Sequence, residues 1–249
     1  MAMPGVCPSR GREGSLRDYY ERLLQHFGPQ GWWPARTRLE VILGAILTQN
    51  TAWSNAALAI KQLRKSGLLS LDKLRRASAD ELERSIHQAG FFRQKTATIR
   101  WFLEYLDSNH DGSLRELFSI QPIELRARLL RIKGLGPETV DAILLYAGRM
   151  PFFVADAYTR RILSRHGWIP AAADYDEAQA VLHQELPRDS ETFNEFHALL
   201  VETGKRYCRR QVPLCEQCPL EEYLPAGPAR RGACNYEVAT APPPRRRQN

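Results

Sequence analysis

Apolar residues recur along most of this chain with the spacing of an α-helix. Between residues 16 and 27 they fall on one side of a helix that would begin after Ser15 as its N-cap. The run 38–48 is apolar enough for a buried helix or a strand, and the absence of strand partners elsewhere favours a helix. The same spacing predicts helices over 52–65, 78–88, 93–106, 122–132, 157–165, 171–185 and 192–207. The pattern therefore predicts an all-α protein.

Both ends of the chain lack this pattern. Residues 1–14 and 235–249 are predicted to be disordered, because a tail with three prolines followed by three arginines cannot build a core. No apolar run is long enough to cross a bilayer, and residues 1–14 contain no apolar core of an export signal. We therefore expect a cytoplasmic protein with no membrane partner.

A Gly-Leu-Gly turn separates the predicted helix 122–132 from a second helix that begins at Pro137. Gly134 and Gly136 permit positive φ angles and close approach of the backbone, and proline suits the first turn of a helix. The amides of such a turn form a cradle for an anion, and Lys133 adds a charge beside it. The net charge of +7 fits a polyanionic partner.

A single carboxylate, Asp156, stands in an apolar stretch twenty residues beyond Gly136. It is either the N-cap of the helix 157–165 or a functional acid. Both roles hold at once, because an N-cap carboxylate stays ionised and points out of the helix end.

Four of the five cysteines lie near the C-terminal end of the chain, at positions 208, 215, 218 and 234. Clustering of this kind in a chain with no export signal favours metal binding over disulfides. Four thiolates can hold an iron–sulfur cluster or a tetrahedral zinc ion.

The hairpin, the aspartate beyond it and the cysteine row together resemble the helix-hairpin-helix, Gly/Pro-rich, Asp (HhH-GPD) superfamily of DNA glycosylases, which includes endonuclease III. The resemblance covers residues 18–234. It implies a six-helix lobe over 37–149 that ends in the hairpin, and a second lobe made of 15–36 with 150–234. A cleft between the lobes would hold a damaged base extruded from double-stranded DNA, with the protein acting as a monomer.

The resemblance also implies roles for single residues. Asp156 would stabilise the positive sugar that forms when the N-glycosidic bond breaks. Lys133, Gly134 and Gly136 would bind DNA, and Arg161 would contact a phosphate or pair with an acid.

The cysteine spacing is similar to the cluster loop of endonuclease III, which implies a structural 4Fe-4S cluster on Cys208, Cys215, Cys218 and Cys234, with zinc as the alternative. The gap before Cys234 is fifteen residues, whereas five are usual in the family. An inserted loop of this length costs little closure entropy, so Cys234 stays the expected fourth ligand.

Glu138 occupies the position at which bifunctional members of the family carry a lysine. That lysine attacks the sugar, and the resulting Schiff base leads to strand cleavage. A carboxylate cannot form a Schiff base, so the sequence predicts a monofunctional glycosylase that uses water.

The segment 31–51 resembles the 3-methyladenine glycosylase subgroup, in which aromatic residues at the positions of Trp33 and Trp53 line the base pocket beside Pro34. Stacking on indole suits a cationic, alkylated purine. Gln49 would fill the gap left by the flipped nucleotide, or else simply cap a helix end. This chain departs from the subgroup because it carries the cysteine row. The histidines show no ligand or triad spacing and are interpreted as surface or packing residues.

Three other functions stay open. The first is an endonuclease III-type glycosylase and lyase for oxidised pyrimidines, and the second is a mismatch glycosylase for uracil or thymine. The third is a non-catalytic binder of damaged DNA, which Asp156 disfavours because binding needs no carboxylate beneath the sugar.

Overall fold

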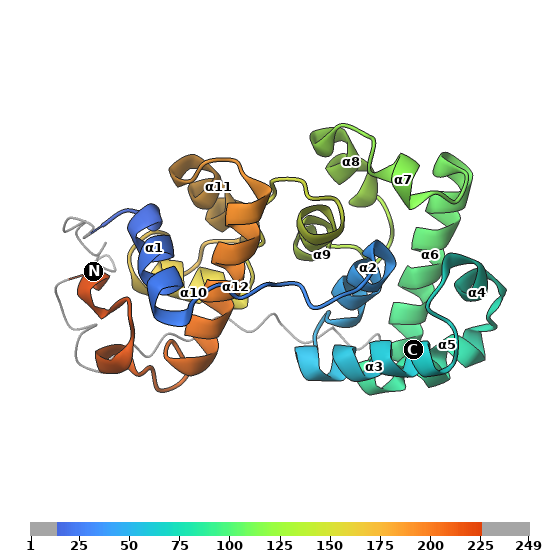
Figure 1. Cartoon of the computed structure of the whole chain (residues 1–249), viewed down its shortest axis with the longest axis horizontal. Coiled ribbons are helices and arrows are strands. Elements are labelled where there is room, and N and C mark those ends of the chain that lie inside the picture. The colour runs from blue at the N-terminus through green and yellow to red at the C-terminus, as the bar shows by residue number, and fades with distance from the viewer. Residues whose placement is uncertain (1–13, 226–249) are drawn as a thin grey trace, which may run out of the picture. The chain divides into compact units, whose positions relative to one another are not determined.

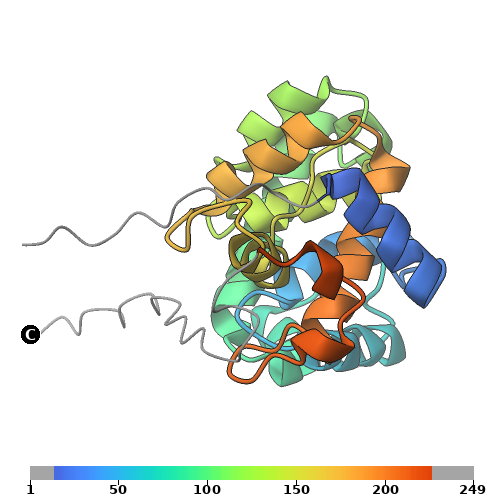
Figure 2. The same cartoon turned by 90° about the vertical axis from the view of Figure 1, so that its left-hand side faces the viewer.

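The computed structural model describes residues 14–225, and all regular secondary structure within that range is helical (Figures 1 and 2). The α-helices are α1 (Leu16–Phe27), α2 (Arg38–Leu47), α3 (Trp53–Lys65), α4 (Leu71–Arg76), α5 (Ala79–Ile86), α6 (Phe92–His110), α7 (Leu114–Leu117), α8 (Pro122–Leu129), α9 (Pro137–Ala142), α10 (Ala157–Arg165), α11 (Tyr175–Glu185) and α12 (Ser190–Arg206). Shorter turns are η1 (His87–Ala89), η3 (Cys215–Gln217) and η4 (Glu221–Tyr223), and η2 (Ile143–Ala147) is a π-helical turn. The all-α prediction is confirmed for the described residues.

Polar residues ahead of the apolar faces start most of these helices. Ser15 forms a capping box with Asp18, and Ser78 forms one with Glu81, so that each pair satisfies two backbone N–H groups. A single side-chain cap starts four other helices, at Thr37, Ser70, Ser113 and Asp156.

The sequence pattern missed two short helices and the end of a third. α4 and α7 each bury one leucine, Leu74 and Leu117, which is too little apolar periodicity to detect. α6 continues beyond 106 to His110 and ends where Asp111 adopts a left-handed conformation. The Asn-His-Asp-Gly segment therefore contains the helix C-cap rather than a loop.

Contacts divide the chain into two compact units. Among the described residues, the first comprises 14–30, 155–187 and 196–225, and the second comprises 31–154 and 188–195. The lobe boundaries predicted from the sequence, near residues 36 and 149, stay predictions.

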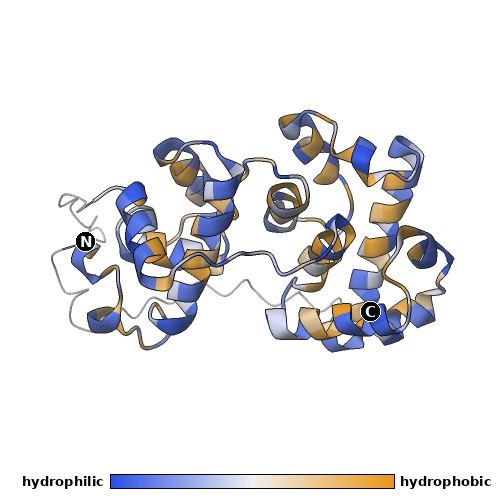
Figure 3. Ribbon diagram, viewed as in Figure 1, coloured by the Kyte–Doolittle hydropathy of each residue, from blue (hydrophilic) through white to orange (hydrophobic). Residues whose placement is uncertain are grey.

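The core of the second unit is built around α2. Apolar residues, orange in Figure 3, fill this helix after its first turn, and every residue from Leu39 to Leu47 is buried. α3, α6 and η2 pack against it. In the first unit, the buried Tyr19 of α1 stacks on Tyr223 and donates or accepts a 3.0 Å hydrogen bond with His166. His166 is thus a packing residue, as predicted, and burial lowers its pKa to about 4.

The predicted hairpin joins α8 to α9 in the second unit. Arg126 donates two hydrogen bonds to the fully buried carboxylate of Asp141, at 2.7 and 3.0 Å, and this bidentate pair fixes one helix against the other. Gly134 has a φ of 86°, and a Cβ there would overlap Thr98 Oγ1. Gly136 is extended, with a φ of −94°, so only Gly134 of the two glycines uses the positive φ that glycine permits.

No helix within residues 14–225 is long and apolar enough to cross a membrane.

Candidate DNA-repair site

Asp156 is the N-cap of α10 in the first unit. Its Oδ1 accepts a 2.8 Å hydrogen bond from the amide of Thr159, and its side chain is 16% exposed. The carboxylate therefore faces the positive end of the helix, where a negative charge is favoured. The capping role predicted for Asp156 is present in the structure, and it leaves Oδ2 available for a second contact.

The second contact comes from His197 of α12. Its Nε2 lies 3.7 Å from Asp156 Oδ2, and both side chains are largely buried. Burial alone would raise the pKa of Asp156, but His197 and the Thr159 amide outweigh it and hold the pKa below its usual value. Asp156 is thus an ionised carboxylate at neutral pH inside a mostly dry setting.

The hairpin turn of the second unit is open to solvent at Lys133, Gly134 and Glu138. Lys133 Nζ lies 4.8 Å from the centroid of the Trp101 ring, a cation–π contact that keeps its charge beside the turn. Glu138 lies in the first turn of α9, where a carboxylate complements the helix dipole.

Gln49 follows the end of α2 and reaches the same hairpin. Its amide Nε2 donates to the carbonyl of Gly134 at 2.8 Å and to Thr139 Oγ1 at 2.9 Å. To enter a base stack, Gln49 would have to give up both bonds. In this structure it links the end of α2 to the turn.

Three aromatic rings of the second unit lie close together. The ring centroid of Trp33 lies 4.8 Å from that of Trp53 and 4.9 Å from that of Tyr146. Gly44 of α2 permits this approach, because a Cβ there would lie 3.1 Å from the Trp33 ring. The structure thus brings together the two tryptophans predicted to line a base pocket, with Pro34 exposed beside them.

The guanidinium of Arg161 makes contacts within the protein. It donates to the carbonyls of Cys208, at 2.8 Å, and Gly204, at 3.3 Å, and it stacks on Tyr158. Both of these hydrogen-bond partners are carbonyls rather than an acid. Arg161 therefore holds the end of α12 and the first cysteine in place.

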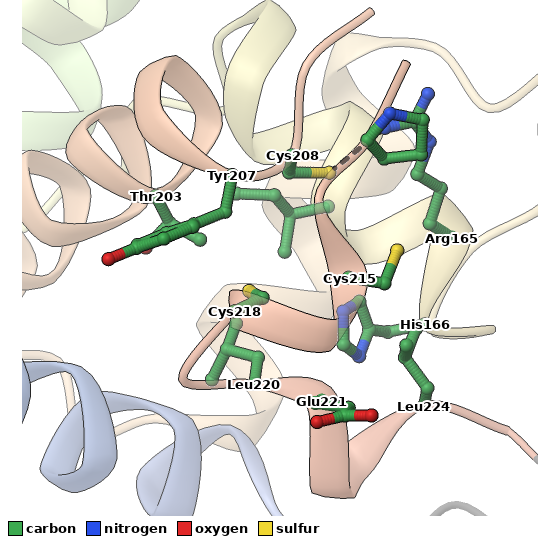
Figure 4. Close-up of a pocket in the computed structure, with 12 residues that line it drawn as sticks. Arg165, His166, Thr203, Tyr207, Cys208, Cys215, Cys218, Leu220, Glu221 and Leu224 are labelled. Carbon is green, nitrogen blue, oxygen red and sulfur yellow. Dashed lines mark hydrogen bonds between the residues drawn. The ribbon is translucent and has the colours of Figure 1, made fainter. Parts of the chain in front are cut away.

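Cys208, Cys215 and Cys218 line one pocket of the first unit together with Arg165, His166, Leu220 and Leu224 (Figure 4). Arg165 donates to the Cys208 sulfur at 3.2 Å. Burial raises the pKa of the Cys218 thiol to about 12, and the two neighbouring cysteines add to this effect. Three thiols thus influence one another in one pocket.

The described residues include no group of three or more His, Cys, Asp or Glu side chains arranged around one metal position. The predicted fourth ligand, Cys234, lies outside the described residues. The donor chemistry nevertheless fits a thiolate-bound group, because three thiols line one pocket and a bound cation would favour their thiolate forms against the burial that raises the pKa of Cys218.

Sequence reasoning missed two residues, one in each unit. His197 was grouped with packing residues, since only the fold brings α12 to the cap of α10. Phe91 is 60% exposed and adopts a left-handed conformation with a φ of 47°. An exposed aromatic in that conformation is uncommon, and the Gly-Phe-Phe sequence at 90–92 was the available signal.

Comparisons with known proteins agree with this architecture. A family model described as "HhH-GPD superfamily base excision DNA repair protein" matches residues 43–188. The chain is 43% identical to "Putative DNA repair glycosylase MJ1434" of Methanocaldococcus jannaschii, over 82% of this chain and 93% of that protein. It is 28% identical to endonuclease III of Sulfolobus acidocaldarius, over 76% of this chain and 82% of that protein.

Solved structures share the fold. A non-covalent endonuclease III–DNA complex matches with a TM-score of 0.72 at 20% identity, covering 84% of this chain and 93% of that one. H. pylori 3-methyladenine DNA glycosylase (MagIII) bound to 1,N6-ethenoadenine matches with a TM-score of 0.67 at 24% identity, covering 76% of this chain and 96% of that one.

The length of the family match and the identity to the archaeal relative place this chain in the HhH-GPD superfamily of base excision DNA repair proteins. It is a DNA N-glycosylase of this superfamily, and its helical fold is the one found in endonuclease III.

The contact between His197 and Asp156 gives a testable prediction. His197→Gln should raise the pKa of Asp156, because it removes the imidazole that favours the ionised form. A carboxyl with a lowered pKa stabilises the fold above its unfolded pKa, and this contribution fades as pH falls through the folded pKa. In the variant this contribution should therefore be smaller, and its loss should be complete at a higher pH.

A ¹³C NMR titration of the Asp156 carboxyl measures this shift directly. Glu185→Gln, which removes an exposed charge at the C-terminal end of α11, is the control and should leave the Asp156 titration unchanged. An unchanged titration in His197→Gln would show that the imidazole does not act on Asp156.

Proposed function

We propose that this protein is a monofunctional glycosylase that hydrolyses the N-glycosidic bond of an alkylated purine, such as 3-methyladenine, in double-stranded DNA. The observation that carries the mode of reaction is Glu138 on the exposed first turn of α9, at the position of the lyase lysine in bifunctional relatives. With no amine there, water is the nucleophile.

Asp156 is the catalytic residue of this proposal. As the bond to the base breaks, positive charge grows on the sugar, and a carboxylate beneath it stabilises that charge. The same carboxylate can orient the attacking water and accept its proton. Its contacts with the Thr159 amide and His197 favour the ionised form, which is the form this chemistry needs.

The aromatic cluster supports an alkylated purine as the base. Trp33, Trp53 and Tyr146 offer flat π-surfaces within one group of side chains. A purine made cationic by alkylation gains cation–π attraction on such surfaces, and its glycosidic bond is already weak. Less help from a general acid is then needed.

The exposed turns of the second unit would bind the DNA. Backbone amides at Gly134 and Gly136, with Lys133, suit phosphate oxygens. Gln49 would exchange its two hydrogen bonds to the hairpin for contacts in the gap left by the flipped nucleotide. Phe91 would stack on a neighbouring base from the turn before α6.

Cys208, Cys215, Cys218 and Cys234 would hold a 4Fe-4S cluster, with zinc as the alternative. When bound, the cluster supplies a covalent cross-link that fixes the loop after α12. Arg165 would donate to a ligating sulfur, and Arg161 would hold the backbone of the first ligand.

The alternative is a bifunctional glycosylase and lyase, which the identity to endonuclease III of Sulfolobus acidocaldarius favours. It would need an amine other than residue 138, and the exposed Lys133 beside the turn is the nearest candidate in the sequence.

Strand cleavage separates the two modes. The unmodified protein should release the base and leave an intact abasic strand that breaks only on later treatment with alkali. Borohydride should trap no covalent protein–DNA adduct, because no imine forms. Efficient trapping would contradict the monofunctional mode, and loss of that trapping in Lys133→Ala would identify the amine.

Asp156→Asn tests the proposed catalytic residue. Base release under single-turnover conditions should fall by about a thousandfold or more, because the charge acts mainly in the transition state. Binding to a lesion duplex should change only by several-fold. Asn also caps helices well, so α10 should stay folded. Near-normal base release would remove Asp156 from the mechanism.

The metal is tested by colour and composition. A protein with a 4Fe-4S cluster should be brown, with absorbance near about 400 nm from sulfur-to-iron charge transfer. Cys218→Ser should abolish the band, while Cys7→Ser should not, because Cys7 lies outside the proposed ligand set. One zinc and no iron per chain would identify the alternative.

A further inference from the structure

Lys95 is a buried ammonium in the second unit that the proposed chemistry does not use. Its residue is 2% exposed, and Nζ donates to two backbone carbonyls, Leu47 O at 2.8 Å and Ala89 O at 2.7 Å. Burial lowers the pKa of Lys95, and no charged group counters this effect. Burying a cation in this setting costs free energy, so the hydrogen bonds to the two carbonyls must offset that cost.

The position of Lys95 is unfavourable for its own helix as well. It lies in the first turn of α6, where the positive end of the helix dipole disfavours a cation. Its partners, however, are the last residues of α2 and η1, whose carbonyls lie at negative helix ends. The ammonium thus stabilises the C-terminal ends of α2 and η1, although its charge is unfavourable at the start of α6.

Those two helix ends lead directly into exposed turns. Leu47 precedes the turn that contains Gln49 and Asn50, and Ala89 precedes the turn that contains Phe91. Asn50 and Phe91 both have left-handed backbones, with φ of 53° and 47°. Non-glycine residues keep this conformation only where the surroundings hold them.

Lys95 holds the second turn twice. Its side chain donates to Ala89 O, and its backbone amide donates to Phe91 O at 3.0 Å. The same side chain reaches Leu47 O, and Gln49 in turn reaches Gly134 O. Three exposed turns of one unit are therefore connected through consecutive hydrogen bonds.

We propose that Lys95 is a positioning residue that connects the 48–51 turn to the 90–91 turn through its hydrogen bonds. Gln49 and Phe91 would then enter the DNA together, from one rigid surface of the second unit. This inference rests on the proposed function, which assigns Gln49 to the gap left by the flipped nucleotide and Phe91 to a neighbouring base. A pre-ordered edge favours insertion, since less conformational entropy is lost when the DNA binds.

Two variants, one at Lys95 and one at the neighbouring Thr96, test whether Lys95 connects the two turns. Lys95→Met removes the ammonium and keeps a long side chain in the core. Thr96→Val is the matched control, because Thr96 is equally buried in α6 and its hydroxyl has no hydrogen-bond partner among the described residues. Lys95→Arg, which keeps the charge with a different reach, serves if the methionine variant does not fold.

The first measurement is amide hydrogen exchange in the protein without DNA. In Lys95→Met, exchange should quicken by about tenfold or more at 48–51 and 89–92, while α8 and α9 stay protected. Thr96→Val should match the unmodified protein. Unchanged exchange in both turns would overturn the proposed connection by Lys95, and so would equal acceleration over the whole second unit.

The second measurement uses a duplex with a tetrahydrofuran abasic analogue next to 2-aminopurine. The unmodified protein should prefer this duplex over an intact one and raise the 2-aminopurine fluorescence as the base unstacks. Lys95→Met should lose about tenfold in this preference and most of the fluorescence rise, with intact-duplex binding within about twofold.

The outcomes separate the inference from the proposed function. Full preference and fluorescence in a Lys95→Met protein with loosened turns would overturn the positioning role alone. A matching loss on both duplexes would show a general structural role and overturn it too. No preference and no fluorescence rise in the unmodified protein would instead refute the proposed insertion of Gln49 and Phe91.

Discussion

Helix ends leave backbone N–H and C=O groups without partners, and the candidate site of this protein depends on how those groups are satisfied. Asp156 accepts from an amide at the start of α10, and Lys95 donates to carbonyls at the ends of α2 and η1. Gln49 donates to the carbonyl of Gly134 in the hairpin turn. In each case the capping group is also a residue to which we assign a role on DNA.

Charge placement follows from the same constraint. The N-terminus of a helix favours a carboxylate, so Asp156 can be mostly buried and still ionised, with His197 on its other side. The bidentate pair of Arg126 with the buried Asp141 serves a different purpose. It fixes α8 against α9, which sets where the turn amides point. Asp156 is the buried acid to which we assign the chemistry, and Asp141 is the one that a guanidinium neutralises.

Much of the fold could be predicted from the sequence, because its signals are local. Ser15, Thr37 and Ser78 cap the predicted helices, and α1 begins and ends where the periodicity placed it. The hairpin was visible in Gly134 and Pro137. The short α4 was missed because a single buried leucine gives no period.

The site was less predictable, because its contacts join residues far apart in the sequence. His197 lies 41 residues after Asp156, and Lys95 lies 48 residues after Leu47. In the sequence Lys95 is one polar residue in an amphipathic helix, typical of a solvated face. Nothing local distinguishes it from Lys61 or Lys65. Only the packing of α6 against α2 and η1 shows that its ammonium is buried.

The central claim is that an ionised aspartate and an aromatic cluster release a cationic purine with water as the nucleophile. The most direct test is single-turnover base release across duplexes that each carry one lesion, with the freed base identified by mass spectrometry. The panel includes 3-methyladenine, thymine glycol, and uracil and thymine opposite guanine. The account predicts rapid release of 3-methyladenine, and release of the oxidised or mismatched pyrimidines slower by about a hundredfold or more. Preferential release of thymine glycol, or of a mismatched pyrimidine, would contradict it.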